Sequence, residues 1–503
     1  MSSSTLPLEN PKPVVMIAGG GLGGLMLGIL LERSNVPYHI FERASEIKSL
    51  GAAMSLSVNI LPVFEQLGLF DELLTFSRWF NNATIYESNL DIIGHVRWKE
   101  QKAVCGYDKI VFARPRLHDL LLRQIPANKI TFGKRILRTE EKDDKVLIHC
   151  SDNSTYAGDI LVGADGAYSS VRQSLYKQLL NKGLLPKSDQ ENLELGYNCM
   201  VGVTDPLDPE RFTQLKDEFT HFTAILGKDR ISWGVSSVTD NQICWILLIQ
   251  FKNADEAAEQ RFRNSEWGPE STDAMVKEFR ECLNPYGGTM GEMIDATPKE
   301  RRSKVFLEEK LFETWFHGRT VLIGDAAHKM IPAAGQGAIN AMQDAVILAN
   351  TLYDMPDTST ESITAAFQDY YDQRFEHAKM QVEISKAMGK ILAGQSLTER
   401  FLRKVLLNYV PDWLNNKNNI KTACYRPQIT WLPFSPNRGT GHILPQKPSK
   451  RYQEQQARGY VSPANATTTA THPAMTGVEM AAENVAENMD VANTVAPATG
   501  AVV

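Results

Sequence analysis

Three glycines near the start of the chain, Gly19, Gly21 and Gly24, have the spacing G-x-G-x-x-G, which suits a loop that binds a diphosphate. The first glycine allows a tight turn, the second lets the backbone approach the phosphates, and the third lets a helix pack closely on a strand. An apolar run over residues 14–18 precedes the loop and a helical pattern follows it. The pattern predicts a buried strand, a turn, and a helix whose N-terminal N–H groups face the phosphates.

An acidic residue follows at the distance that a bound nucleotide requires. Glu42 lies 18 residues after Gly24, at the end of a predicted strand over Tyr38–Phe41. A carboxylate there accepts hydrogen bonds from the ribose hydroxyls and repels a 2′-phosphate. We therefore expect a tightly bound FAD or NAD rather than NADP, and we include the neighbouring Arg43 among the candidate cofactor-binding residues.

A second constellation lies at residues 319–350, where a predicted strand over 321–323 ends in Gly324 and Asp325 and a helix is expected to start near Ala338. A carboxylate at the carboxyl end of a strand can accept hydrogen bonds from ribityl hydroxyls. The helix N-terminus offers N–H groups to the edge of a flavin that becomes negative on reduction.

The same segment resembles the second fingerprint of the single-component flavoprotein monooxygenases, GD-x-x-H-x-x-x-P-x-x-G-x-G-x-N-x-x-x-x-DA, with every fixed position matched. The resemblance implies that Asp325 binds the ribityl chain of FAD. It extends to the other candidate cofactor-binding residues of this segment, which are Gly324, Pro332, Gly335, Gly337 and Ala338. His328, within the motif, is expected to be a structural loop residue rather than a site of covalent flavin attachment.

Three further segments resemble parts of the same family. The strand and turn containing Asp165 and Gly166 are similar to its DG motif, which is linked to both FAD and the passing NADPH. A pattern R-x-x-L-x-x-x-L falls on Arg114, which the resemblance assigns to flavin contact. The segment from Gly51 to Ser55 resembles the part that closes over the flavin.

Composition excludes several other classes of protein. The 503 residues are 43% hydrophobic and 22% charged, as in soluble globular chains, and 53 basic against 59 acidic residues leave no basic excess for nucleic acid. The six cysteines are scattered without a C-x-x-C pair, so we expect neither a zinc site nor a redox pair, and no metal. Free thiols and the absence of a secretory signal favour a cytoplasmic protein. The uncharged run over 14–31 contains six glycines, so no transmembrane segment is expected.

The elements that would position these residues define an α/β (α+β) fold. We expect a Rossmann-like FAD-binding domain with an inserted antiparallel β-sheet substrate domain and a helical C-terminal part. The predicted strands of the inserted sheet are 197–203, 221–226, 231–238 and 243–251. The expected boundaries are 14–185 and 301–352 for the FAD-binding domain, 186–300 for the substrate domain, 353–460 for the helical region, and 461–503 for a disordered tail.

Few residues of the predicted substrate domain are suited to acid–base chemistry. Tyr197 and His221 are the candidates, although neither has a paired partner in the sequence and a structural role is preferred for both. Phe222, Trp233 and Trp245 either line a pocket or, as we favour, pack in the core. The predicted helix over 400–410 has an apolar stripe beside basic residues, which is typical of a core helix with a solvated face or of peripheral membrane contact.

Taken together, the motifs resemble those of an FAD-dependent monooxygenase. The resemblance implies that NADPH or NADH reduces the flavin, that dioxygen adds to give a flavin hydroperoxide, and that one oxygen is transferred to an organic substrate. The segments 425–428 (YRPQ) and 431–433 (WLP) resemble fungal members that act on isoprenoid or meroterpenoid intermediates, so we expect a bulky apolar substrate and a role in secondary metabolism. The alternatives are a flavin-dependent reductase or oxidase on the same fold, and a non-catalytic prenyl-protein carrier of the Rab-GDI type.

Overall fold

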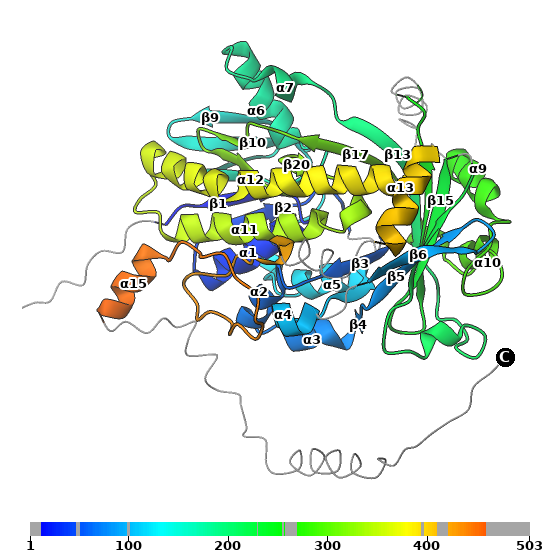
Figure 1. The fold of residues 1–503 in the computed structure, drawn as a ribbon. Helices are drawn as coiled ribbons and strands as arrows, with labels where there is room; N and C mark the ends of the chain where they lie inside the picture. Colours follow the sequence, from blue (N-terminus) through cyan, green and yellow to red (C-terminus); the bar gives the residue numbers. More distant parts are fainter. Residues whose placement is uncertain are drawn as a thin grey trace, which may run out of the picture. The chain divides into compact units, whose positions relative to one another are not determined.

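Figure 1 shows the computed structural model, which describes residues 12–46, 51–97, 101–228, 230–253, 256, 269–393, 397–409 and 421–458. Residues 1–454 form one compact unit. A second unit, 455–503, is described only where it continues helix α15 (Lys450–Ala457). The predicted disordered tail, 461–503, lies outside the described residues.

A six-stranded sheet forms the first layer, and its strand order requires crossovers between distant parts of the chain. The order is β18-β19-β12-β1-β2-β8, with parallel pairing throughout except at β18. The strands are β1 (Val15–Ala18), β2 (Tyr38–Phe41), β8 (Ile130–Thr131), β12 (Ile160–Gly163), β18 (Phe316–His317) and β19 (Thr320–Leu322). The central strands are buried along their whole length, as continuous apolar runs predict for a parallel sheet covered on both faces.

Helix α1 (Leu22–Arg33) follows β1, and helix α11 (Gly337–Tyr353) follows the segment after β19. The two helices pack so closely that a Cβ on Gly23 would lie 3.2 Å from the backbone oxygen of Ala341. A Cβ on Gly324 would lie 3.0 Å from the side chain of the same alanine. The glycines of both sequence motifs therefore bring the two helices together near their N-terminal ends.

An eight-stranded sheet forms the second layer, in the order β20-β17-β13-β16-β15-β14-β5-β6. It is antiparallel except for one parallel pair, β14 with β5. Its strands are β5 (Asn82–Glu87), β6 (Ile92–Arg97), β13 (Glu194–Val203), β14 (Phe222–Leu226), β15 (Ile231–Ser237), β16 (Ile243–Gln250), β17 (Ser303–Leu311) and β20 (His328–Lys329). The four strands predicted between 197 and 251 are present. The sheet nevertheless extends beyond the predicted 186–300 region, because four of its strands come from outside that region.

The two faces of the eight-stranded sheet have different partners. One face packs on α9 (Pro269–Phe279) and α10 (Met290–Asp295) through a core that includes Trp233 and Trp245. The indole N–H of Trp245 donates to Thr297 Oγ1 at 2.8 Å. Both tryptophans are therefore core residues, as preferred from the sequence.

The other face of the eight-stranded sheet packs on a three-stranded sheet, β3-β7-β4. Its strands are β3 (Ala53–Leu56), β4 (Arg78–Trp79) and β7 (Ile110–Ala113). A cluster that includes Val111 and Ala113 on β7 and Val203 and Cys244 on the larger sheet joins the two, with Phe222 packed against it.

The remaining elements are short except for two C-terminal helices. Helix α12 (Thr360–Ala393) contacts α11, which covers the six-stranded sheet, and β17 of the eight-stranded sheet (Figure 1). Helix α13 (Leu397–Asn408) packs on β6. The sequence also predicts that the helical region beginning at Thr360 is capped at Gly394, which lies outside the described residues. The other elements are α2 (Leu61–Gln66), α3 (Phe70–Thr75), α4 (Gln101–Cys105), α5 (Arg114–Leu122), α6 (Ser170–Asn181), α7 (Lys187–Gln190), β9 (Ile136–Lys142), β10 (Lys145–Cys150) and β11 (Thr155–Gly158). Within the described ranges, no helix is long and apolar enough to cross a membrane.

A buried ion-pair network joins the segment after β19 to helices α11 and α12. Asp344 and Arg374 are both fully buried, and Arg374 Nε donates to Asp344 Oδ1 at 2.7 Å. Asp344 Oδ2 accepts from the backbone N–H of Gly324 at 2.8 Å and lies 2.6 Å from His328 Nε2. Burial alone would raise the pKa of Asp344, but His328 and Arg374 outweigh it and hold the pKa below its usual range. His328 is thus a structural residue of the core.

Replacing Arg374 with Met should destabilise the fold strongly, because it leaves the Asp344 carboxylate buried without the permanent positive charge of the guanidinium. Loss of one partner of a buried pair costs about 3–5 kcal/mol. The free energy of unfolding in urea measures the loss. The matched control is Lys216→Met, which breaks the exposed 2.6 Å pair with Glu210 and should cost no more than about 1 kcal/mol. Equal losses in the two variants would contradict the role of the network.

Candidate cofactor and active site

The glycine loop between β1 and α1 has the geometry that a close-approach turn requires. Gly19 has φ +105°, and a Cβ there would lie 2.5 Å from the backbone oxygen of Ala164. A Cβ on Gly24 would lie 2.1 Å from the oxygen of Gly19, so neither position can accept a side chain. Gly21 has nothing within 4 Å of its Cβ position, which leaves open space in front of the N-terminus of α1. Gly19 and Gly24 therefore cannot carry a side chain, and Gly21 leaves the space that the predicted approach of the backbone to phosphates requires.

Two side chains hold the peptide groups of Gly20, within this loop. Glu42 Oε2 accepts from the N–H of Gly20 at 2.7 Å, and its Oε1 accepts from the N–H of Ala44 at 2.8 Å. His118 Nε2 donates to the Gly20 carbonyl at 2.8 Å from helix α5. Burial lowers the pKa of His118, which keeps the imidazole neutral. Arg43 follows Glu42 on the exposed side of the chain.

Asp165 and Gly166 lie directly beside the glycine loop. A Cβ on Gly19 would lie 3.0 Å from the Cα of Asp165, and Gly166 has φ +82°. Asp165 Oδ2 accepts from the N–H groups of Ser170 and Val171 and so caps helix α6. Its Oδ1 is buried and has no hydrogen-bond partner among the described residues. Burial raises the pKa of Asp165, and the hydrogen bonds to α6 oppose the rise.

Asp325 lies just after the end of β19 and has two basic side chains near it. Lys329 Nζ donates to Asp325 Oδ2 at 2.6 Å. Arg114, at the start of α5, is close enough for an electrostatic interaction with Asp325, which opposes the lowering of the Arg114 pKa by burial. The side chain of Arg114 lies across Gly51, because a Cβ on Gly51 would come within 2.9 Å of Arg114 Cδ.

The segment after Asp325 also contacts strand β3. Gly335, with φ +65°, faces Ser55 of β3, whose Oγ would lie 3.4 Å from a Cβ on that glycine. Pro332 begins the short helical turn that Gly335 ends. Gly337 and Ala338 form the first turn of α11. The structure therefore gathers the predicted cofactor-binding residues, other than the exposed Arg43, around the N-terminal ends of α1 and α11.

Tyr197 and His221 do not form an acid–base pair. They lie on β13 and immediately before β14, and β16 and β15 separate these strands, which corresponds to about 14 Å at the usual strand spacing. Tyr197 lies near Ile331, since both side chains approach Gly389 of α12. Burial raises the Tyr197 pKa to about 12, with a further contribution from Glu309. His221 bonds to Asp217 at 2.5 Å on the protein surface.

The sequence interpretation missed two residues of the site, His118 and Lys329. Each lies four residues after a predicted cofactor-binding residue, Arg114 and Asp325 respectively. Residues four apart lie on one face of a helix, so the position of His118 on the predicted helix was a usable signal. Lys329 lies in a loop and a short strand, where the spacing of four has no such meaning.

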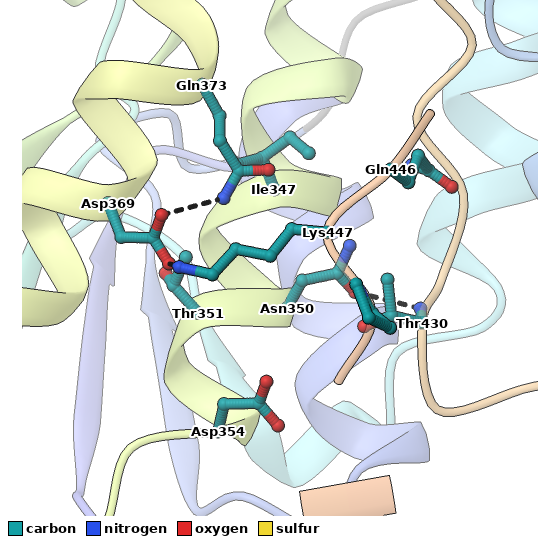
Figure 2. Close-up of a pocket in the computed structure, with 10 residues that line it drawn as sticks. Ile347, Asn350, Thr351, Asp354, Asp369, Gln373, Thr430, Gln446 and Lys447 are labelled. Atoms are coloured by element: carbon teal, nitrogen blue, oxygen red, sulfur yellow. Dashed lines mark hydrogen bonds and ion pairs between the residues drawn. The ribbon is translucent and has the colours of Figure 1, made fainter. Parts of the chain in front are cut away.

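A small hollow elsewhere is not part of this site. It lies between α11, α12 and the C-terminal segment, and its polar side chains pair with one another (Figure 2). Lys447 Nζ donates to Asp369 Oδ2 at 2.6 Å, and Asn350 exchanges hydrogen bonds with the backbone of Gln428 and Thr430. None of the predicted cofactor-binding residues lines the hollow, and we assign it to the docking of the C-terminal segment.

Comparisons with known proteins identify the family of the chain. The FAD binding domain family matches residues 12–384. The FAD-dependent monooxygenase ptmM of Penicillium ochrochloron is 29% identical over 85% of this chain and 100% of its own length. The FAD-dependent monooxygenase paxM of Penicillium paxilli is 29% identical over 86% of this chain and 90% of its own. The crystal structure of Klebsiella pneumoniae HpxO with FAD and uric acid has a TM-score of 0.67 at 21% identity, covering 82% of this chain and 97% of HpxO.

The chain belongs to the FAD binding domain family. The predicted α/β fold, the FAD cofactor and the reaction class of an FAD-dependent monooxygenase are confirmed. These findings favour the oxygenase over the reductase, oxidase and carrier alternatives.

Asp325→Ala and Arg114→Ala should each weaken FAD retention without unfolding the protein, because both residues lie at the ends of elements. Loss of a charge-assisted hydrogen bond costs about 1.5–3 kcal/mol, which corresponds to roughly ten- to hundred-fold weaker binding. The ratio of flavin to protein after gel filtration and the FAD dissociation constant of the apoprotein measure the effect. The control is Arg138→Ala, at an exposed arginine on β9. Normal FAD content in both test variants would show that the site is misplaced.

Proposed function

We propose that FAD is held where the glycine loop, Asp165 and Asp325 meet, and that the protein oxygenates a bulky apolar substrate. The unpartnered Asp165 Oδ1 and the open space at Gly21 fit a ligand with hydroxyl and phosphate groups. The N-termini of α1 and α11 and the Arg114 guanidinium supply donors and positive charge for the diphosphate and for the flavin edge. FAD, when bound, accepts a hydride from NAD(P)H and activates dioxygen so that one oxygen atom reaches the substrate.

The residues of the chain then have the tasks of binding, orienting and excluding water. Glu42 is proposed to accept from the adenosine ribose, for which it must exchange its hydrogen bond to Gly20 or share it. Asp325 is proposed to accept from the ribityl chain. Gly51 and Ser55 close the site beside Arg114 and Gly335. In the balanced reaction, substrate, dioxygen, NAD(P)H and a proton become oxygenated product, water and NAD(P)⁺.

The single observation that supports the substrate class is an apolar face of the eight-stranded sheet, formed by Cys199, Val201, Ile246, Leu248 and Val305. Cys199 pairs with Leu248 and Val305, and Val201 pairs with Ile246, so the paired residues lie on the same face. Cys199 and Val201 also share that face, because successive side chains of a strand point to opposite faces of the sheet. Ile246 and Leu248 are only partly buried although they lie on a central strand.

The apolar sheet face points toward the proposed flavin site. At one end the same face continues into Val203 and Cys244, which pack on β7 just before Arg114. At the other end it continues into Tyr197, which approaches Ile331 in the segment after Asp325. The five residues of the face are uncharged at neutral pH, since burial raises the pKa of Cys199 to about 12. Such a surface fits a hydrocarbon skeleton better than a small carboxylate, which would need a paired cation.

The oxygenase proposal is tested by NADPH or NADH oxidation in the presence of candidate substrates. We expect strong stimulation by prenylated or polycyclic apolar compounds and incorporation of one ¹⁸O atom from ¹⁸O₂ into the product. Leu248→Asp should abolish the stimulation, because it places a charge on the apolar sheet face, while the FAD content is retained. Leu248→Met is the control and should behave like the parent protein. Stimulation by small phenols or salicylate-like acids alone would overturn the substrate class.

We also propose that the protein works in a reducing, cytoplasmic compartment and contacts membranes peripherally. All six cysteines are unpaired. Helix α13 packs on β6 through Leu407 and Asn408 and leaves Phe401 and the following Tyr409 71% and 72% exposed. Ile92, on the neighbouring strand, is 58% exposed. Exposed aromatic side chains beside the basic Lys404 are suited to the interface of an anionic bilayer.

Sedimentation with phosphatidylserine-containing vesicles tests the membrane contact. The parent protein should sediment with the vesicles, and Phe401→Ser combined with Tyr409→Ser should release most of it. Leu184→Ser is the matched control, since Leu184 is an exposed apolar residue on a different segment. A parent protein that stays in the supernatant would contradict the proposal.

A further inference from the structure

Lys329 occupies a position that links the two layers of the molecule. It lies on β20, which follows Asp325 by two residues and forms the edge strand of the eight-stranded sheet through pairing with Lys310 and Leu311 of β17. The side chain of Lys329 reaches Asp325, four residues earlier in the chain, and its Nζ donates to Asp325 Oδ2 at 2.6 Å. The carboxylate proposed to bind FAD is therefore held by a cation that belongs to the sheet proposed to bind the substrate.

The lysine of this ion pair is largely buried. The side chains of Lys329 and Asp325 are 20% and 33% exposed, whereas the pair of Lys102 with Asp108 is 74% and 36% exposed. Burial alone would lower the pKa of Lys329, but the charge and hydrogen bond of Asp325 outweigh it and raise the pKa above its ordinary value. The lysine is therefore a fixed positive charge at neutral pH.

Other charges surround the pair without cancelling its effect on Asp325. Glu308 of β17 stabilises the charged form of Lys329, and the charge of Arg114 opposes it. Lys329 engages Oδ2, and among the described residues no other hydrogen bond to the Asp325 carboxylate is present. That arrangement directs Oδ1 to a further donor, which for the proposed cofactor is a ribityl hydroxyl.

We propose that Lys329 is a positioning residue for the flavin: it orients the Asp325 carboxylate and places a positive charge beside the cofactor. The inference rests on the proposed location of FAD at Asp325. A fixed cation near the flavin favours the reduced form, which has the more negative charge, so it raises the reduction potential. The same cation strengthens FAD binding by holding the carboxylate in one orientation.

The test compares Lys329→Met, which removes the charge at similar volume, with Lys329→Arg, which keeps it. The readouts are the FAD dissociation constant of the apoprotein and the midpoint potential of the bound flavin, measured by dye equilibration without any substrate. We expect Lys329→Met to bind FAD about tenfold more weakly, as for loss of one hydrogen bond to a charged group, and to have a lower midpoint potential. Lys329→Arg should restore most of the potential. Lys216→Met, which changes a surface lysine, is the control and should change neither value.

A double-variant cycle separates this inference from the site assignment. In an Asp325→Asn background, Lys329→Met should have little further effect on the FAD dissociation constant, because the two residues act through one contact. If Asp325→Ala weakens FAD binding but Lys329→Met changes neither affinity nor potential, the inference is wrong and the FAD site stands. If Asp325→Ala has no effect, the site assignment itself is wrong. Equal midpoint potentials in the Lys329→Met and Lys329→Arg proteins would also overturn the inference. If Lys329→Met does not fold, Lys329→Gln takes its place.

Discussion

The buried carboxylate of Asp344 is the constraint on which the arrangement of the cofactor site depends. It accepts the backbone N–H of Gly324 at the end of β19 and contacts His328 and Arg374, which belong to β20 and α12. A buried charge of this kind is tolerated only when it is fully paired, so the four segments must come together in one geometry. Asp325 and Lys329 each adjoin a residue of this network in the chain, and their positions follow from it. The residues proposed to touch FAD thus lie on a framework that is fixed by residues that do not.

The two layers are joined at several points rather than by a flexible linker. β20 continues the eight-stranded sheet directly from the segment that contains Asp325, and α12 contacts both α11 and β17. At the other end, β7 packs on Val203 and Cys244 of the large sheet and leads into Arg114. The apolar sheet face is therefore supported on both sides by elements of the proposed cofactor site. Oxygen transfer requires this fixed relation, because small displacements of the reacting groups are costly in rate.

Sequence reasoning succeeded where a structural requirement is local. The turn at Gly19–Gly24, the strand–turn at Gly324 and the helix from Gly337 each depend on neighbouring residues, and all are present as predicted. The pairing of β5 with β14, and of β17 with β13, joins segments more than 100 residues apart and has no local signal. For the same reason Tyr197 and His221 could be chosen as side chains of suitable chemistry but not placed relative to each other. The ion pair of Lys329 depends on a short strand that only the sheet pairing defines.

The strand order also determines when, during synthesis, the protein can acquire its nucleotide site. β1 is central in the six-stranded sheet, yet its neighbour β12 and the next strand β19 end at residues 163 and 322, and α11 ends at Tyr353. At roughly 5–20 residues per second, about 20–70 s pass between the synthesis of β1 and that of α11. β2 can pair with one edge of β1 early, but the other edge stays unpaired until β12 has been made, and an unpaired apolar edge is the state in which nascent chains aggregate or bind chaperones. A chain truncated before α11 retains the complete glycine fingerprint but lacks half of the structure that makes the fingerprint a binding site.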